Sequence, residues 1–496
     1  MQIIQGLNLT GNVCAMLLFA VLGMVVMYLA PVRWRVFVLL AESILFYALC
    51  DFRFLGLLLF ETILTWFCGQ KIGENLNKSK AGDGDDVYSG TCGDDPASDA
   101  SSGRRRADGY LVLGIVVVVL VLAIMKYAGF FASVFQFSSA SLVMPLGISY
   151  YSFREISYLA DIRMGKRGAE KSFVRYAAYV MLFLHIVSGP IARSEGILDQ
   201  FRSGIRWSEQ LACNGLCLVL SGMFKKLVIA NRLSSYVDTI FSSYSSTMGT
   251  ALWLAAVLYS IELYCDFAGY SEIAVGLTNL CGLPCELNFR QPYLANSMQQ
   301  FWRRWHISLS SWLRDYIYIP LGGNRKGKLR KNLNVLAVFL VCGLWHGAGL
   351  TYVIWGLYHG IWDMLWRDHR GSEKKHGIRQ VISCIGVFLV AMFGWIIFRS
   401  DSLPAAFEYL YRMMTQTSVS AATIEAAILP FTMDSSCVAY FLTVVIMIAV
   451  LLAIEWEENY HEGRFQKLAN ARNCLYLVLI LLFGIEGTGS FLYANF

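Results

Sequence analysis

Long apolar runs separated by short polar stretches set the pattern of this chain. Runs of about twenty apolar residues are long enough to cross the hydrocarbon core of a membrane as helices. The segments near 128–160 and 285–325 instead mix aromatic, charged and glycine residues, which predicts re-entrant or interfacial pieces. The pattern predicts twelve membrane-spanning helices, near residues 13–30, 34–50, 53–69, 110–127, 173–190, 209–230, 250–269, 332–346, 351–366, 379–398, 437–454 and 473–493.

The composition excludes an ordinary soluble domain. Hydrophobic residues make up 56% of the 496 residues and charged residues only 15%, whereas a soluble domain carries about a quarter charged residues. The net charge of +6 comes from short basic clusters between apolar runs, which is typical of membrane topology and not of a nucleic-acid-binding surface. We therefore expect an all-α polytopic membrane protein with no nucleic-acid partner.

The basic clusters also orient the chain in the membrane. They follow the first, third and ninth predicted spans and precede the eighth. Because basic residues favour cytoplasmic loops, all these clusters are expected in the cytoplasm and both chain termini outside it. The clusters comprise Arg33, Arg35, Lys71, Lys78, Lys80, Arg104, Arg105, Arg106, Arg325, Lys326, Lys328, Arg330, Lys331, Arg367, Arg370, Lys374, Lys375 and Arg379.

One polar segment, residues 77–109, divides the predicted helices. It is rich in Gly, Asp and Ser and has few apolar residues, which predicts a disordered cytoplasmic loop. The expected organisation is therefore N-terminal transmembrane helices over 1–76, this loop over 77–109, a core over 110–398 and C-terminal transmembrane helices over 399–496.

Among the seven histidines, His346 has the most unusual setting, inside the apolar stretch "FLVCGLWHGAGL" (339–350). An ionisable side chain at membrane depth is costly and faces a cavity or a partner, and a neutral imidazole there can take a proton from a hydroxyl. Haem ligation is disfavoured because His346 and His359 would differ by about 220° around a helix. No metal-ligand spacing is present. We interpret His185 and His359 as packing histidines.

His306 lies in a second notable stretch, "QQFWRRWHISLSSWLRDYIYIPLGGNRKG" (299–327). Its tryptophans and arginines have the character of a membrane interface. Two interpretations stay open for Trp302, Arg303, Arg304 and Trp305: they cradle a phosphorylated donor or a lipid headgroup, or they only anchor the chain at the membrane surface. A Ser-His-Asp nucleophile set gains little support because no G-x-S-x-G pattern is present.

These stretches together carry a family resemblance. The chain resembles the membrane-bound O-acyltransferase family, and within it the bacterial subgroup of alginate O-acetylase and its peptidoglycan and exopolysaccharide relatives. It departs from that subgroup at Arg154, where Gln is frequent, and at Leu184-His185, where a Phe-Pro pair is usual. Arg154, directly after Phe153, and the "SGPIxR" form are also reminiscent of the D-alanyl transfer protein of teichoic acid modification, a cousin in the superfamily. The motifs that carry the resemblance are "PLGISYYSF" (145–153), "SGPIAR" (188–193), "FKKLVIANRL" (224–233), "YSIELYCDFAGYSEIAVGL" (259–277), residues 287–327, "GLWHGAGLTYVIWGLYHG" (343–360) and the ending "SFLYANF".

The resemblance implies a ring of about 11–12 tilted transmembrane helices, plus re-entrant and interfacial helices, around a central tunnel, with residues 110–398 as the catalytic core. It places the essential histidine at His346 and the second characteristic histidine at His306. Tyr264 and Asp266 match family positions and would shape the tunnel or pack the helices. Asn324, in "PLGGNRKG", joins Trp302, Arg303, Arg304 and Trp305 as an expected substrate-binding residue, and no metal is expected.

The implied activity is O-acetyl transfer from a cytoplasmic thioester donor to hydroxyls of an extracytoplasmic envelope polysaccharide. The donor would be acetyl-CoA or an acyl carrier protein thioester, with no bound cofactor. The transfer would be direct or completed by an exported hydrolase-like acetyltransferase, in a multi-pass protein of the bacterial cytoplasmic membrane surrounded by membrane lipid. Two alternatives stay open: D-alanyl transfer from a carrier protein towards teichoic acid, and a transporter or channel without chemistry.

Overall fold

The computed structural model describes residues 9–82, 96–134, 143–187, 189–367, 377–431, 437–461 and 466–486. In these ranges the regular structure is helical throughout, and they contain no strand. The predicted all-α class is confirmed. The expected terminal motif "SFLYANF" and Ser188 of "SGPIAR" lie outside the described residues.

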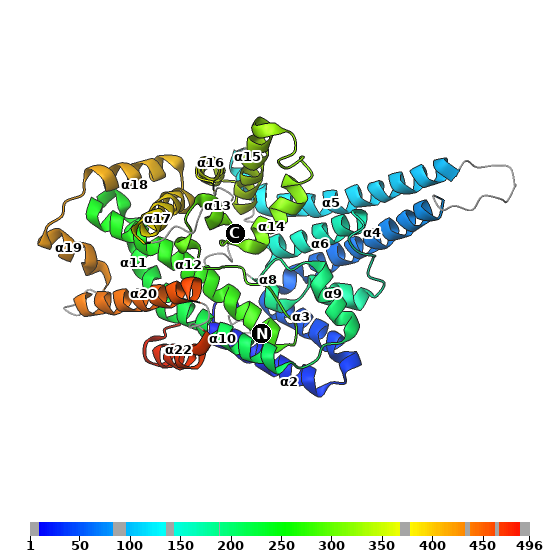
Figure 1. Ribbon diagram of the computed structural model, residues 1–496, viewed down its shortest axis with the longest axis horizontal. Coiled ribbons are helices and arrows are strands. Elements are labelled where there is room, and N and C mark those ends of the chain that lie inside the picture. The colour runs from blue at the N-terminus through cyan, green and yellow to red at the C-terminus, as the bar shows by residue number, and fades with distance from the viewer. Residues whose placement is uncertain are drawn as a thin grey trace.

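The first part of the chain builds long helices that lie side by side, with α4 and α5 extending together to one end of the molecule (Figure 1). Helices α3, α4 and α5 also pack against the shorter helices α6 and α7. The elements of this part are α2 (Val13–Leu29), η1 (Val32–Trp34), α3 (Arg35–Asp51), η2 (Phe52–Phe54), α4 (Leu55–Gly82), α5 (Pro96–Val134), α6 (Ile148–Arg163), α7 (Phe173–Val180), α8 (Phe183–Ile186) and α9 (Ser194–Ser203).

The middle of the chain is organised around the antiparallel pair of α10 and α12, the latter almost entirely buried. Glycines on each helix meet the other helix's backbone, so the two axes approach closely. The elements are α10 (Glu209–Met223), the π-helical η3 (Phe224–Ala230), α11 (Asn231–Ser242), η4 (Tyr244–Ser246), α12 (Gly249–Leu280), η5 (Pro292–Leu294), α13 (Met298–Trp302), α14 (Ile307–Leu313) and the π-helical η6 (Arg314–Tyr318).

The last part adds an antiparallel pair, α15 and α16, and the helices that close the remaining side of the molecule (Figure 1). These elements are α15 (Gly327–His346), α16 (Leu350–Leu365), α17 (Ile378–Arg399), α18 (Leu403–Thr415), α19 (Ala421–Ile428), η7 (Leu429–Phe431), α20 (Cys437–Tyr460) and α22 (Ala469–Phe483).

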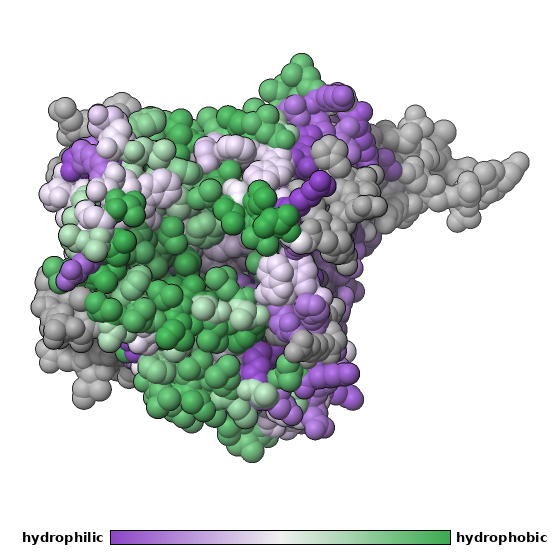
Figure 2. Space-filling model, turned by 60° about the vertical axis from the view of Figure 1, so that its left-hand side comes forward, coloured by the Kyte–Doolittle hydropathy of each residue, from purple (hydrophilic) through white to green (hydrophobic). Residues whose placement is uncertain are grey.

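The outer surface fits a membrane protein. In the ranges given above, six helical stretches are long and apolar enough to cross a membrane, and four shorter apolar helices accompany them. Figure 2 shows a broad hydrophobic face, with hydrophilic residues gathered along one edge of the molecule. Many leucines, valines and isoleucines on these helices are exposed to the surroundings, which is favourable only in contact with lipid.

The structure corrects two expectations about the chain's segments. The first is the disordered loop over 77–109: α4 continues to Gly82 and α5 begins at Pro96, so helix replaces part of the expected loop. Residues 83–95 lie outside the described residues. The polar composition of the segment predicted a loop. Two helices that pack against each other can, however, extend beyond their apolar regions, and their ends then remain helical without apolar side chains.

The second correction concerns residues 173–190, where one spanning helix was expected. The run instead forms α7 and α8, separated by an irregular turn, and almost all of its residues are buried. The Arg154 guanidinium donates to the carbonyls of Tyr179 and Val180 at 3.1 and 2.9 Å, and these carbonyls end α7. A buried charged donor therefore satisfies the backbone groups that the break leaves without helical partners.

The segment 285–325, expected to be re-entrant or interfacial, holds the short elements η5, α13, α14 and η6. Helices α13 and α14 lie near the middle of the molecule and are surrounded by longer helices (Figure 1). Phe301, Trp305 and Leu309 on this segment are almost completely buried. The backbone around α13 and the first turn of α14 is thus covered by protein, as irregular structure at membrane depth requires.

Candidate functional site

His346 is the last residue of α15 and is 3% exposed. The next residue, Gly347, has an extended backbone (φ 176°), and a Cβ there would lie 2.4 Å from the Tyr352 ring. At Gly343, a Cβ would lie 2.3 Å from the Tyr352 carbonyl oxygen. The glycines beside His346 therefore bring α15 and α16 together and end α15 at the histidine, which gives them a packing role.

His306 stands at the start of α14 in the left-handed backbone region, with φ 45°. Its Nδ1 lies 3.1 Å from Oδ1 of Asn288, and the Ser308 backbone N–H and hydroxyl donate to the same oxygen at 3.1 and 2.9 Å. Because the Ser308 N–H can only donate, the shared atom is the amide oxygen, and His306 must carry its proton on Nδ1. Its Nε2 is buried and has no hydrogen-bond partner within the part of the chain that the structure describes. This nitrogen then keeps a lone pair that can accept a proton.

Both histidines lie close to the indole ring of Trp345. The Trp345 ring centroid lies 4.7 Å from that of His346 and 6.2 Å from that of His306. Trp355 and Phe398 close the other sides of His346, each with its ring centroid 5.1 Å away. The structure therefore brings together the two histidines singled out in the sequence, in a buried aromatic surrounding where electrostatic interactions are strong.

Lys126 of α5 is a neighbour of this site that sequence reasoning missed. Its ammonium donates to the Trp345 carbonyl and lies 5.2 Å from the centre of the Trp345 ring. The neighbouring Tyr127 hydroxyl donates to the Leu344 carbonyl. A cation at the carbonyl end of α15 suits the helix dipole. A lone lysine inside the apolar run 110–127 was the sequence signal that could have revealed it.

Asn288 was also missed, and no sequence signal singled it out. It lies in an irregular stretch 18 positions before His306, and only the fold brings its side chain to the imidazole. The interpretation of His185 and His359 as packing histidines agrees with their full burial. His185 Nε2 lies 3.0 Å from the Thr278 hydroxyl, and His359 is enclosed by Trp302, Trp355 and Trp395.

The predicted tryptophan–arginine group divides between two places. Trp302 packs on Trp355, and Arg303 lines a cavity beside it. Arg304 faces elsewhere, with one guanidinium nitrogen 2.9 Å from Oδ1 of Asn459 on α20. Trp305 is fully buried. The two successive arginines, which follow the end of α13, therefore lie in different environments.

The remaining predicted residues lie around the site, not in its centre. The Tyr264 hydroxyl donates to Glu455, and its ring lies 6.2 Å from that of Trp305. Asp266 forms a buried ion pair with Lys226 of η3. Asn324 is exposed in the turn before α15. The binding roles expected for these residues stay predictions.

The cavity that Arg303 lines has a volume of about 340 Å³ and lies between α13, α14, η6, α15 and α16. It is strongly basic, with four cationic side chains against one carboxylate, Asp363. On α15 it is bounded by Val335, Val338, Phe339 and Cys342, positions that share one helix face. The same face continues, three and four residues further on, with Trp345 and His346. The cationic residues are Arg303, Arg314, Lys331 and Arg367.

Comparison with known proteins decides the family. A model of the membrane-bound O-acyltransferase family matches residues 149–365. The probable alginate O-acetylase of Azotobacter vinelandii is 36% identical over 408 residues, which cover 80% of this chain and 76% of that protein. The chain belongs to the membrane-bound O-acyltransferase family.

Two other relatives show the breadth of the match. The peptidoglycan O-acetyltransferase of Helicobacter pylori is 28% identical over 514 residues, covering 94% of this chain and 92% of that protein. The teichoic acid D-alanyltransferase of Bacillus subtilis is 28% identical over 249 residues, covering 48% and 62%. The resemblance drawn from the motifs is confirmed, and this membrane-bound O-acyltransferase is a multi-pass membrane enzyme that transfers an acyl group to a hydroxyl.

Proposed function

We propose that this enzyme takes an acetyl group from a phosphorylated cytoplasmic thioester, of the acetyl-CoA type, and delivers it to hydroxyls of an extracytoplasmic envelope polysaccharide. The single observation that carries the proposal is the basic cavity whose apolar edge on α15 leads to His346. An O-acetyl product is favoured because the peptidoglycan O-acetyltransferase aligns with 94% of this chain and the D-alanyltransferase with 48%.

The cavity's chemistry fits the polar end of such a donor. Its four cations can bind phosphate groups. Lys331 and Arg367 belong to the basic clusters that the positive-inside rule assigns to the cytoplasm, so the cavity would open towards that side of the bacterial inner membrane. The donor's thioester arm would then follow the α15 face past Cys342 to His346, which lies one turn further along the helix.

The transfer itself needs a base and a stabilised oxyanion. As the acceptor hydroxyl oxygen attacks the thioester carbonyl carbon, its proton passes to the His346 imidazole and a C–O bond forms. The tetrahedral intermediate then collapses, the C–S bond breaks and the thiolate leaves with the proton. Lys126 is the nearby cation that can stabilise the developing oxyanion. His306, fixed by Asn288, orients the acceptor hydroxyl.

The acceptor could be the polysaccharide itself or an exported hydrolase-like acetyltransferase that completes the transfer. The first experiment deletes the gene, restores it as wild type or as His346→Ala, and identifies the esters that mild alkali releases from the cell envelope. We expect acetate to be lost in the deletion and to stay absent with His346→Ala. D-Alanine behaving in this way would move the assignment to D-alanyl transfer from a carrier protein. Acetate restored by His346→Ala would refute the catalytic role.

Binding of the donor in the basic cavity is tested separately, by measuring KM for acetyl-CoA in membranes that contain variant enzymes. Arg303→Gln and Arg367→Gln should each raise KM for acetyl-CoA about tenfold, because a charge-assisted hydrogen bond contributes roughly 1.5–3 kcal/mol. Lys328→Gln is the matched control, since Lys328 is an exposed basic residue near the cavity that does not line it. Unchanged KM in both cavity variants, or transfer only from a carrier-protein thioester, would exclude acetyl-CoA at this site.

A further inference from the structure

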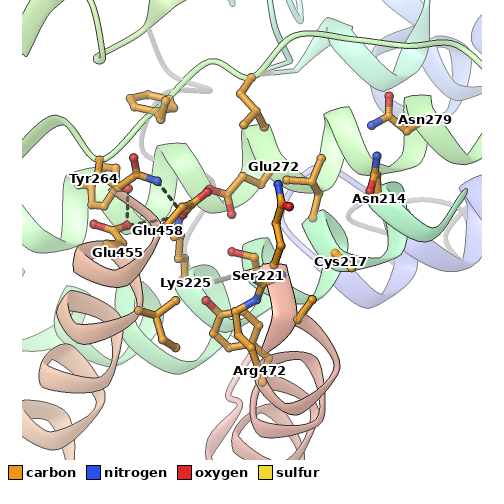
Figure 3. A pocket seen from close by; sticks show the side chains of 18 of the residues that line it. Asn214, Cys217, Ser221, Lys225, Tyr264, Glu272, Asn279, Glu455, Glu458 and Arg472 are labelled. Carbon is orange, nitrogen blue, oxygen red and sulfur yellow. Dashed lines mark hydrogen bonds and ion pairs between the residues drawn. The ribbon is translucent and has the colours of Figure 1, made fainter. Parts of the chain in front are cut away.

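A second and larger cavity, of about 710 Å³, lies between α10, η3, α12, α20 and α22. Its wall reaches the candidate site at Phe289, whose ring centroid lies 6.4 Å from that of His306. Its walls combine amides and charged groups with the rings of Tyr264, Phe289 and Tyr476. Figure 3 shows Tyr264, Glu272, Glu455 and Glu458 gathered in one part of it, with Asn214 and Asn279 at some distance from them. The proposed acyl transfer uses none of the residues that line this cavity.

Three carboxylates and a lysine form the polar end of this cavity. Lys225 of η3 pairs with Glu272 and lies 3.6 Å from Glu455. Glu455 also accepts a hydrogen bond of 2.5 Å from the Tyr264 hydroxyl, and Glu458 accepts one of 2.6 Å from Gln291. Arg472 lines the same cavity, so three carboxylates face two cations, and the excess carboxylate attracts a further cation or hydrogen-bond donor.

One of these acceptors is unsatisfied. Glu272 is 8% exposed, and its Oε1 pairs with Lys225. Its Oε2 is buried and has no hydrogen-bond partner among the described residues. A buried carboxylate oxygen without a donor is costly. Because Glu272 lines the cavity, a bound molecule that carries N–H groups could supply the missing hydrogen bond.

The position of the charged residues relative to the apolar runs indicates that this molecule is a component of the membrane. Glu455 and Glu458 follow directly after the apolar run 438–454 of α20, and Arg472 precedes the apolar run 474–483 of α22. Charges where apolar runs end lie at the headgroup level of a bilayer. Exposed apolar side chains such as Leu452, Leu477 and Leu481 continue from them along α20 and α22 and would contact lipid tails.

We propose that this cavity binds the headgroup of a phospholipid that carries a primary ammonium group, a phosphoethanolamine lipid. Its ammonium donates to Glu272 and Glu458, its phosphate pairs with Arg472, and its acyl chains lie along the apolar surfaces of α20 and α22. The cavity thus holds cationic and anionic side chains in one space, as a zwitterionic headgroup requires.

The test measures which lipid stays bound to the full-length protein. The purified protein is reconstituted in nanodiscs of mixed phosphatidylethanolamine, phosphatidylcholine and phosphatidylglycerol, and retained lipids are counted by native mass spectrometry. Phosphatidylethanolamine should be enriched at least about tenfold, because a trimethylammonium group cannot donate hydrogen bonds and a glycerol headgroup carries no cation. Equal retention of the three lipids would overturn the proposal.

Variants localise the effect to the cavity. Arg472→Gln, Glu458→Gln and the space-filling Ala469→Trp should each abolish the enrichment, whereas Lys467→Gln, an exposed basic residue just before α22, should preserve it. Thermal melting of each variant confirms that it is folded before its lipids are counted. Enrichment that survives in all three cavity variants would place the lipid elsewhere. Soluble phosphoethanolamine that binds as tightly as the lipid would make the ligand a soluble phosphoryl compound and refute the lipid assignment.

Discussion

Asn288 holds His306 in one tautomer, with the proton on Nδ1. If His306 acts in acyl transfer as proposed, removing the Asn288 amide oxygen should reduce kcat by more than the loss of folded protein explains. That oxygen accepts three hydrogen bonds, from His306 Nδ1 at 3.1 Å, the Ser308 N–H at 3.1 Å and the Ser308 hydroxyl at 2.9 Å. Asn288→Leu keeps a similar volume but leaves these buried donors without an acceptor. The Nδ1–H tautomer then loses about 1–3 kcal/mol of preference.

This free energy corresponds to a decrease in kcat of roughly ten- to a hundredfold. KM for the donor should change little, because Asn288 does not line the basic cavity. The assay is acetyl transfer in membranes at saturating acetyl-CoA, with the amount of folded enzyme normalised by fluorescence-detected size exclusion. Asn288→Asp restores an acceptor at the same atom and should recover most of the lost kcat.

A matched control separates this positioning role from general destabilisation. Asn334 is equally buried and donates to the carbonyls of Leu321 and Gly323 at 3.4 and 2.9 Å, which holds the turn before α15. Asn334→Leu should lower the melting temperature and leave kcat per folded molecule close to wild type. Equal kcat losses in the two leucine variants, or failure of Asn288→Asp to recover activity, would refute the tautomer argument.

Three further predictions follow from packing and charge. Lys126→Met should lower kcat by about two orders of magnitude with little change in KM, if its ammonium stabilises the oxyanion; steady-state kinetics would exclude that role if KM alone changed. Gly343→Val should destabilise by more than about 2 kcal/mol, since its Cβ would meet the Tyr352 carbonyl oxygen at 2.3 Å, and thermal melting should show no such loss for Gly56→Val, where a Cβ meets no atom within 4 Å. Lys226→Met should cost about 3–5 kcal/mol because the Asp266 carboxylate loses its buried cation; adding Asp266→Asn should restore part of the melting temperature, and a further decrease would contradict this explanation.

Much of the fold could be predicted because its signal is local. Apolar runs and basic clusters mark helices such as α5, α12 and α17 directly in the sequence. The prediction failed over 173–190 because an apolar run surrounded by protein has the same composition as one surrounded by lipid. The break in that run depends on Arg154, which reaches the Tyr179 and Val180 carbonyls from α6, and no pattern within 173–190 shows this.

The sequence by itself determined the helical membrane architecture, the family and the two histidines, because hydropathy and short motifs are properties of neighbouring residues. The tertiary structure alone decided what surrounds those histidines. It placed Asn288 on His306, Lys126 at the Trp345 carbonyl, and Arg303 and Arg304 in different environments. The Asn288 and Lys126 contacts join residues 18 and 219 positions apart. Interactions at such separations depend on how the helices cross, which is set by the packing of the whole molecule.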